Sequence, residues 1–218
     1  MISVVSAFIF PFLNNTCPNI TPMPNFNTSE YIRSTWYIQQ QQVTGYQPPE
    51  SLYCVAQTLN YSDAHVPFYN GSVLSVYNYG VLNEVNGTQM NPNNYTLCAR
   101  QTNSSLPSDI LNAPCLIPNL FAGPYWVINA GPTSTNYEWA IVSGGPPTVK
   151  YSDGNCSTSL RGVNGSGLWL FTRERFGKMA TYYTQTMRSY LQNVGFTLSN
   201  LLNVTQRGCN YNRSFIKY

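Results

Sequence analysis

Short runs in which apolar and polar residues alternate follow one another along most of the chain. The runs that we expect to form strands cover residues 35–42, 51–61, 71–82, 95–102, 115–120, 125–130, 137–143 and 167–173. Turn-forming residues such as Asn86-Gly87 separate the runs, and two runs are expected to end at Gly131-Pro132 and at residues 144–147. Short strands at this spacing predict a series of antiparallel hairpins.

A helical pattern follows the last expected strand, over residues 178–194, and Gly195 is a typical helix stop. Its apolar and aromatic stripe, at spacings of three and four residues, consists of Met179, Tyr182, Tyr183, Met187, Tyr190, Leu191 and Val194. The order predicts an all-β protein with one C-terminal α-helix. Closing eight strands into an antiparallel up-and-down barrel would remove exposed edges and leave room for one small ligand.

Composition limits the class of protein. The chain has 218 residues, of which 43% are hydrophobic and 9% charged, with a net charge of +3. This size allows one domain with a core. Lysine and arginine are scattered, so nucleic acid and acidic membrane surfaces are poor candidate partners. No apolar run approaches the roughly 20 residues of a membrane-spanning helix.

The N-terminal residues are excluded from the expected fold. Residues 1–13 resemble the apolar part of a signal peptide, but they lack a basic start and a clear cleavage site. We therefore interpret residues 1–16 as the remnant of a trimmed or atypical signal peptide together with a disordered arm. Residues 14–33, rich in Asn, Pro and Thr, are expected to be extended.

Cysteines and N-x-S/T sequons favour a secreted glycoprotein. The six cysteines form no C-x-x-C pair and the chain has one histidine, so we expect no metal site and no cofactor. An even number of cysteines fits three disulfides, and reduced buried cysteines are the alternative. Sequons are frequent, although Asn richness alone is another explanation. The expected glycosylation sites are Asn60, Asn86, Asn94, Asn103 and Asn164.

Three short motifs resemble, in order, those of the lipocalins. They are Thr35-Trp36-Tyr37, Thr135-Asn136-Tyr137 and Trp169-Leu170-Phe171-Thr172-Arg173. Ser34 and Asn136 depart from the family's Gly and Asp, and residues 167–173 taken alone would be interpreted as an edge strand with an incidental Arg. The resemblance covers roughly residues 17–212 as a lipocalin domain, followed by a tail at 213–218. It implies a lipocalin calyx in which Arg173 stacks across Trp36 at the closed end.

Finer matches are similar to apolipoprotein D and the bacterial lipocalins. They are Cys17-Pro18-Asn19, Asn60-Tyr61-Ser62, Val76-Tyr77-Asn78, Pro124-Tyr125-Trp126 and the early position of Cys54 in its strand. This resemblance implies the disulfides Cys17–Cys156 and Cys54–Cys209, and it leaves Cys98 and Cys115 to pair with each other.

The resemblance implies a carrier of a small hydrophobic ligand such as a lipid, sterol, retinoid or fatty acid. Trp126 and Asn78 match ligand-contacting positions of apolipoprotein D, and Tyr61 matches a third if the strand carries a two-residue insertion. Strand alternation adds Tyr53, Val55, Ile128 and Ile38. We expect Trp126 and Ile128 to face inward, because an inward Asn129 would need a buried partner.

Two other functional classes remain open. An enzyme would need Cys54 as a free thiolate inside the barrel, and the match of Cys54 to a disulfide position argues against this, so we predict no enzyme. A binding module would use loops and glycans to contact proteins or surfaces. The expected partner is a small hydrophobic ligand, and any association of the protein with a membrane or a lipoprotein is expected to be weak. The expected location is extracellular, and the sequence does not fix an oligomeric state.

Overall fold

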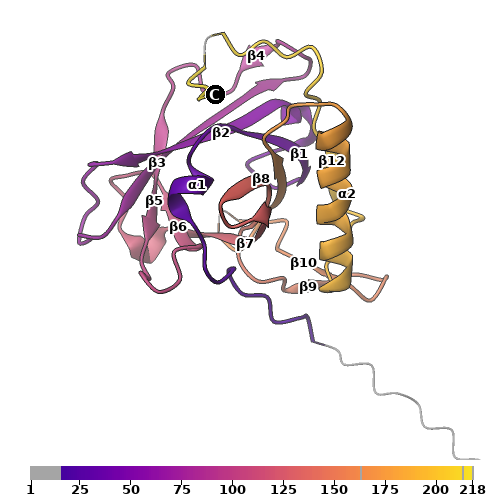
Figure 1. The fold of residues 1–218 in the computed structure, drawn as a ribbon, viewed down its shortest axis with the longest axis horizontal. Coiled ribbons are helices and arrows are strands. Elements are labelled where there is room, and N and C mark those ends of the chain that lie inside the picture. The colour runs from indigo at the N-terminus through magenta and orange to yellow at the C-terminus, as the bar shows by residue number, and fades with distance from the viewer. Residues whose placement is uncertain (1–15, 163, 213, 218) are drawn as a thin grey trace, which may run out of the picture.

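The computed structural model describes residues 16–162, 164–212 and 214–217, and its main feature is a closed antiparallel barrel (Figure 1). Its strands pair in the order β1-β2-β3-β5-β6-β7-β8-β11, and β11 pairs back with β1. The bounds are β1 Trp36–Gln42, β2 Tyr53–Ser62, β3 Val73–Leu82, β5 Thr96–Gln101, β6 Asp109–Ala113, β7 Gly123–Thr133, β8 Asn136–Ser143 and β11 Leu168–Thr172. The predicted eight-stranded up-and-down barrel is therefore confirmed.

Smaller elements lie around this barrel. The α-helices are α1 Thr28–Tyr31 and α2 Lys178–Asn193, and the 3₁₀ helices are η1 Pro49–Ser51 and η2 Asn119–Phe121. The short strands are β4 Thr88–Gln89, β9 Val149–Lys150, β10 Cys156–Ser157 and β12 Leu201–Asn203. Helix α2 runs along the outside of the barrel, as predicted (Figure 1). The predicted extended arm is wrong in one place, because α1 forms there, with Asn27 capping it by accepting a hydrogen bond from the Glu30 amide.

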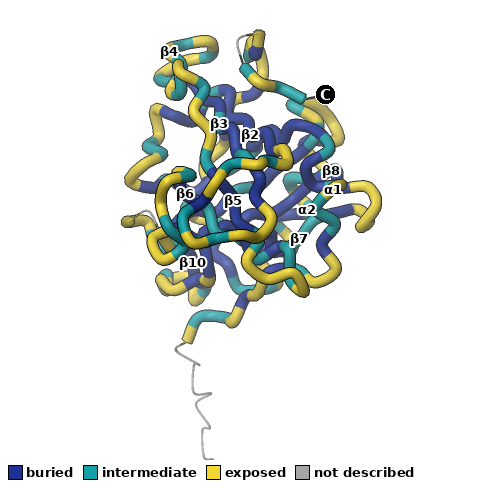
Figure 2. The backbone as a smooth tube through the Cα atoms, turned by 90° about the vertical axis from the view of Figure 1, so that its left-hand side faces the viewer, coloured by how far each residue is buried: buried dark blue, intermediate teal, exposed yellow. Residues whose placement is uncertain are grey.

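Side chains that alternate along the strands form two separate cores. One set fills the interior of the barrel and includes Trp36, Leu59 and Val127. The other set lies outside and packs strands against α2, as Leu168 and Met187 do. The barrel strands are mostly buried, whereas exposed backbone is concentrated in the loops (Figure 2). Several strands therefore have no solvent-facing side.

The predicted apolar stripe of α2 is correct in its C-terminal part. Met187 and Leu191 are buried, and Tyr183, Tyr190 and Val194 pack against the same outer core. Met179 and Tyr182 are exposed instead, and Ala180 takes the inner position of the first turn. Successive helical residues differ by about 100°, so a shift of one residue moves a side chain off the packed face.

Two predicted strand boundaries are wrong. The expected strand 115–120 is a loop containing η2, and β6 instead covers Asp109–Ala113. Pro118 cannot donate to a strand ladder, whereas residues 109–113 contain no proline and place Ile110 in the barrel core. Gly131-Pro132 does not end its strand either, because β7 continues to Thr133 through a shift in register.

Three intrachain disulfides form, and their pairs are the predicted ones. The Cα atoms are 5.7 Å apart in Cys17–Cys156, 5.5 Å in Cys54–Cys209 and 4.9 Å in Cys98–Cys115. The first attaches the N-terminal segment to β10, and the third joins the β6–β7 connection to β5. Because all six cysteines are paired, the alternative of reduced cysteines is wrong.

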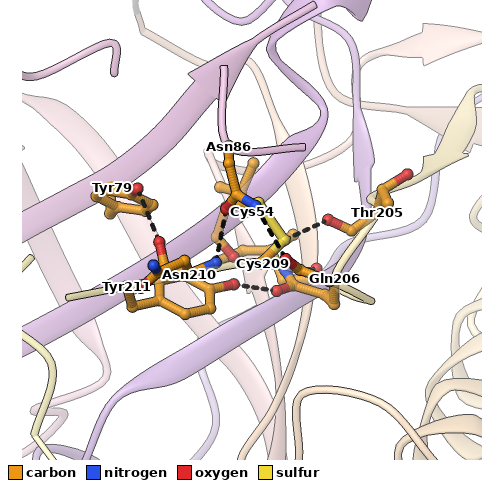
Figure 3. The surroundings of a disulfide bond; sticks show 11 residues. Cys54, Tyr79, Asn86, Thr205, Gln206, Cys209, Asn210 and Tyr211 are labelled. Carbon is orange, nitrogen blue, oxygen red and sulfur yellow. Dashed lines mark hydrogen bonds between the residues drawn. A yellow bond between two sulfur atoms is a disulfide. The ribbon is translucent and has the colours of Figure 1, made fainter. Parts of the chain in front are cut away.

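The Cys54–Cys209 disulfide anchors the C-terminal segment to the outer face of β2 and β3 (Figure 3). Around it, Tyr79 donates a hydrogen bond to the carbonyl of Asn210, and Tyr211 donates one to Gln206. Farther along, the amide of Lys217 donates to the Thr35 hydroxyl. The described part of the predicted tail, residues 214–217, therefore packs on the barrel.

Candidate functional site

The closed end of the barrel is built by the three predicted motifs. The guanidinium carbon of Arg173 lies 3.3 Å from the ring centroid of Trp36, which is fully buried. The predicted stacking is therefore confirmed. The Arg173 guanidinium also donates hydrogen bonds to the backbone carbonyls of Glu30, Tyr31, Ser34 and Tyr137. Burial lowers the pKa of this guanidinium, and the nearby positive charge of Arg33 lowers it further.

The second motif joins the same end. The Tyr137 hydroxyl accepts a hydrogen bond from the amide of Asn27, and the Tyr137 amide donates to the carboxylate of Glu30. Arg33 donates to the side-chain oxygen of Asn136 at 3.3 Å, while Thr135 is exposed. These bonds attach α1 and the segment before β1 to the β7–β8 turn. The closed end is a structural plug rather than a binding surface.

A cavity of about 730 Å³ occupies the rest of the barrel. It opens at the end where β1 finishes, because Tyr46 and Gln47 line it while Trp36, at the start of β1, lies at the plug. Its apolar wall includes Ile38, Val55, Leu97, Trp169 and Phe171. This volume falls in the range of small-molecule sites, which is roughly 300–1,000 Å³.

A chain of neutral polar groups crosses the barrel interior at the inner end of the cavity. The hydroxyls of Tyr31 and Tyr125 are 2.7 Å apart, and Tyr125 donates to the side-chain oxygen of Gln57 at 2.5 Å. The Gln57 amide in turn donates to the side-chain oxygen of Asn78 at 2.8 Å. Burial raises the pKa of both phenols, so they stay protonated near neutral pH.

Three of the seven predicted ligand-binding residues line the cavity. They are Asn78, Val55 and Ile38. Tyr61 instead lies near the C-terminal end of β2, at the closed end of the barrel; it is 60% exposed, and its hydroxyl is hydrogen-bonded to that of Ser29. Tyr53 packs in the outer cluster around Cys54, because a β-bulge between Tyr53 and Ala56 interrupts the alternation of β2.

The predicted orientation of β7 is wrong. Trp126 and Ile128 belong to the outer core beneath α2, whereas Tyr125 and Val127 face the barrel interior. Both faces of this strand are apolar, so alternation alone could not choose between them. Asn129 does not continue the inward alternation of Tyr125 and Val127, because the register shifts between Val127 and Asn129. It therefore needs no buried partner. The inward Tyr125 hydroxyl finds its partners in Gln57 and Tyr31.

Several cavity residues were missed by the sequence analysis. Gln57 follows Val55 by two positions, so strand alternation could have found it. Trp169 was assigned only to a motif, although it lines the cavity and donates its indole hydrogen to Gln47. Ile117 and Phe121 come from the β6–β7 connection, and no sequence pattern places that loop at the mouth.

The expected glycosylation sites lie at the surface. Asn60, Asn86, Asn103 and Asn164 are exposed, and Asn94 is half-buried. The side chain of Asn86 donates to the carbonyl of Gly208 and accepts from the amide of Asn210 (Figure 3). Asn164 stands at the mouth of the cavity. Glycosylation of these residues stays a prediction.

The described residues contain no group of three or more His, Cys, Asp or Glu side chains that could hold a metal ion. Across the same ranges, none of the helices is both long enough and apolar enough to span a membrane.

Solved structures with this arrangement are similar to the chain along most of its length. Lobster apocrustacyanin A1 is 14% identical, with a TM-score of 0.52 covering 88% of this chain and 92% of that one. Apocrustacyanin C2 is 13% identical, with a TM-score of 0.51 and coverage of 89% and 93%. Apocrustacyanin C1 is 14% identical, with a TM-score of 0.51 and coverage of 84% and 83%. A comparison with protein-family models and one with curated proteins found no match. The similarity shows that the chain has the lipocalin fold.

Proposed function

We propose that this protein binds and carries a small hydrophobic molecule in the barrel cavity. The observation that carries the proposal is a cavity of about 730 Å³ with a largely apolar wall and a few convergent polar groups. Such a space can bury most of a small ligand while Asn78 and its neighbours fix the orientation. The fold of the crustacyanins supports this proposal at the level of architecture.

We also propose that the protein is a secreted glycoprotein and that it is related most nearly to the apolipoprotein D branch. Three disulfides support an oxidising compartment, since such bonds persist mainly outside the cytosol. A carrier is favoured over an enzyme because Cys54 is bound to Cys209 and supplies no thiolate.

Native mass spectrometry of the protein from a eukaryotic secretory host tests the carrier function. We expect a co-purifying small molecule at a one-to-one ratio, or saturable uptake of a neutral fluorescent probe such as N-phenyl-1-naphthylamine by delipidated protein. An empty protein that also fails to take up the probe would contradict the proposal.

A second candidate is weak association with a lipid surface, favoured by the β6–β7 connection. Leu116, Leu120 and Phe121 are 81%, 84% and 65% exposed there, and Phe121 also lines the cavity. Exposed apolar side chains beside a mouth suit transfer of a ligand from a membrane. Flotation with phosphatidylcholine vesicles tests this, and we expect Leu120→Ser to lose the co-floating fraction. Equal flotation of parent and variant would reject this surface.

A further inference from the structure

We infer that the ligand is an uncharged amphiphile, with an apolar body and one neutral oxygen, a hydroxyl or carbonyl, that accepts a hydrogen bond from Asn78. The inference rests on the proposed function and names the chemical class of its ligand. It excludes carboxylates, sulfates and ammonium groups as the buried end of the ligand.

The first step is the absence of charge. No Asp, Glu, Lys, Arg or His is among the described residues that line the cavity. The polar side chains at its inner end are the amides of Gln57 and Asn78 and the phenol of Tyr125. Burying an ionised group without a partner of opposite charge costs far more than burying a neutral hydroxyl that is hydrogen-bonded.

Among the described residues, the two most deeply placed cations do not supply a partner. Arg173 lies at the plug, where backbone carbonyls and the face of Trp36 surround its guanidinium. Arg100 is fully buried on the outer side of β5, since its neighbour Ala99 faces the interior. The Arg100 guanidinium donates to the carbonyls of Cys98, Ala113, Pro114 and Ile117. The terminal nitrogens of both guanidinium groups therefore already donate to backbone carbonyls, and neither arginine lines the cavity.

The second step is the direction of the hydrogen-bond chain. Tyr125 uses its single hydroxyl hydrogen on Gln57, so Tyr31 must be the donor between the two phenols. Gln57 then donates to the side-chain oxygen of Asn78. Within the described residues the side-chain nitrogen of Asn78 has no partner, and Asn78 lines the cavity. An N–H donor is thus left for the ligand, and it requires an acceptor.

Matched ligands that differ only in the head group test the inference. We would measure displacement of N-phenyl-1-naphthylamine by retinol and retinoic acid, and by hexadecanol, hexadecanoic acid and hexadecylamine. At about pH 7.5 we expect each alcohol to bind at least about tenfold more tightly than its acid and than the amine. The acids should gain affinity as the pH falls to about 5, because their carboxyl groups become protonated, while the alcohols should not change.

The variant Asn78→Asp isolates the donor. A carboxylate still accepts the hydrogen bond from Gln57, but it has lost the N–H group and carries a negative charge. We expect this variant to lose about tenfold in affinity for retinal, whose carbonyl oxygen can only accept a hydrogen bond, and to bind hexadecylamine more tightly than the parent does. Circular dichroism checks that Asn78→Asp folds. If it does not fold, Asn78→Leu, which also removes the donor, takes its place.

The outcomes separate the two proposals. Acids that bind as tightly as alcohols at about pH 7.5, or an Asn78→Asp variant with unchanged selectivity, would overturn the neutral ligand and leave the carrier function standing. Failure of the probe and of every ligand to bind would overturn the carrier function and this inference together.

Discussion

At the scale of single residues, Arg173 contributes most to the closed end. Its guanidinium donates to backbone carbonyls of two segments that are distant in sequence, residues 30–34 and Tyr137, and covers the buried face of Trp36. Removing it would leave those carbonyls without their donors in a buried place. The same side chain has no contact with the cavity, so its role is stability rather than ligand choice.

We expect Arg173→Ala to lower the free energy of unfolding by about 3 kcal/mol. The cation–π contact contributes on the order of 0.5–2 kcal/mol, and the unpaired carbonyls add about 1–3 kcal/mol. Urea denaturation followed by fluorescence measures the change, and probe affinity should change much less than stability. Arg175→Ala is the control, because the guanidinium carbon of Arg175 lies 5.7 Å from the Phe176 ring centroid, a longer contact than the 3.3 Å between Arg173 and Trp36. Equal losses for the two variants would contradict this role of Arg173.

The buried phenols predict a loss of stability in alkali. Burial raises the folded-state pKa of Tyr31 and of Tyr125, so the unfolded chain releases these protons first. Stability is therefore full below the unfolded pKa of about 10 and falls as the pH rises above it. Urea midpoints measured between about pH 8 and 11 test this, and Tyr125→Phe should show a shallower fall. A parallel fall in parent and variant would show that Tyr125 does not contribute.

At the scale of elements, the β6–β7 connection shapes the mouth of the cavity. Arg100 donates to its carbonyls, and the Cys98–Cys115 disulfide joins its start to β5. Ile117 and Phe121 of this connection line the cavity. A loop held at one end by a disulfide and a buried guanidinium can keep a fixed opening.

The disulfides should differ in what their removal changes. In the chain-entropy model, a separation of 139 residues makes Cys17–Cys156 worth about 5 kcal/mol, and 17 residues make Cys98–Cys115 worth about 3 kcal/mol. We expect Cys17→Ser/Cys156→Ser to lose more stability, and Cys98→Ser/Cys115→Ser to lose more probe affinity. Thermal unfolding and probe titration of both double variants check this. The reverse order in either measurement would contradict it.

Sequence patterns located most elements but not which face of each strand is inward. The periods of two and of 3.6 residues placed seven barrel strands and α2 near their observed positions. Alternation could not show which face of β7 is inward, because α2 covers the outer face of this strand. Trp126 and Tyr125 are therefore both in apolar surroundings. Tyr53 was misplaced because bulges break alternation and leave no mark in composition.

At the scale of the whole molecule, the structure consists of a plug at the closed end, a cavity and three disulfides that cross-link the chain. The motif residues Trp36, Tyr137 and Arg173 all lie at the plug, so the sequence resemblance reported the fold more faithfully than the ligand site. The cavity depends on residues such as Gln57 and Trp169, whose neighbours are set only by closure of the barrel. Residues with the strongest sequence signal therefore need not be those that contact a ligand.

Contact quenching of tryptophan by a brominated long-chain alcohol tests the central claim, a ligand inside the barrel, most directly. Trp169 lines the cavity and Trp126 lies outside beneath α2, so the two rings form a matched pair. We expect saturable quenching in the parent and in Trp126→Phe, and loss of most of that quenching in Trp169→Phe. If Trp169→Phe were quenched as strongly as the parent while Trp126→Phe lost the response, the ligand would lie outside the cavity and the proposed function would be wrong.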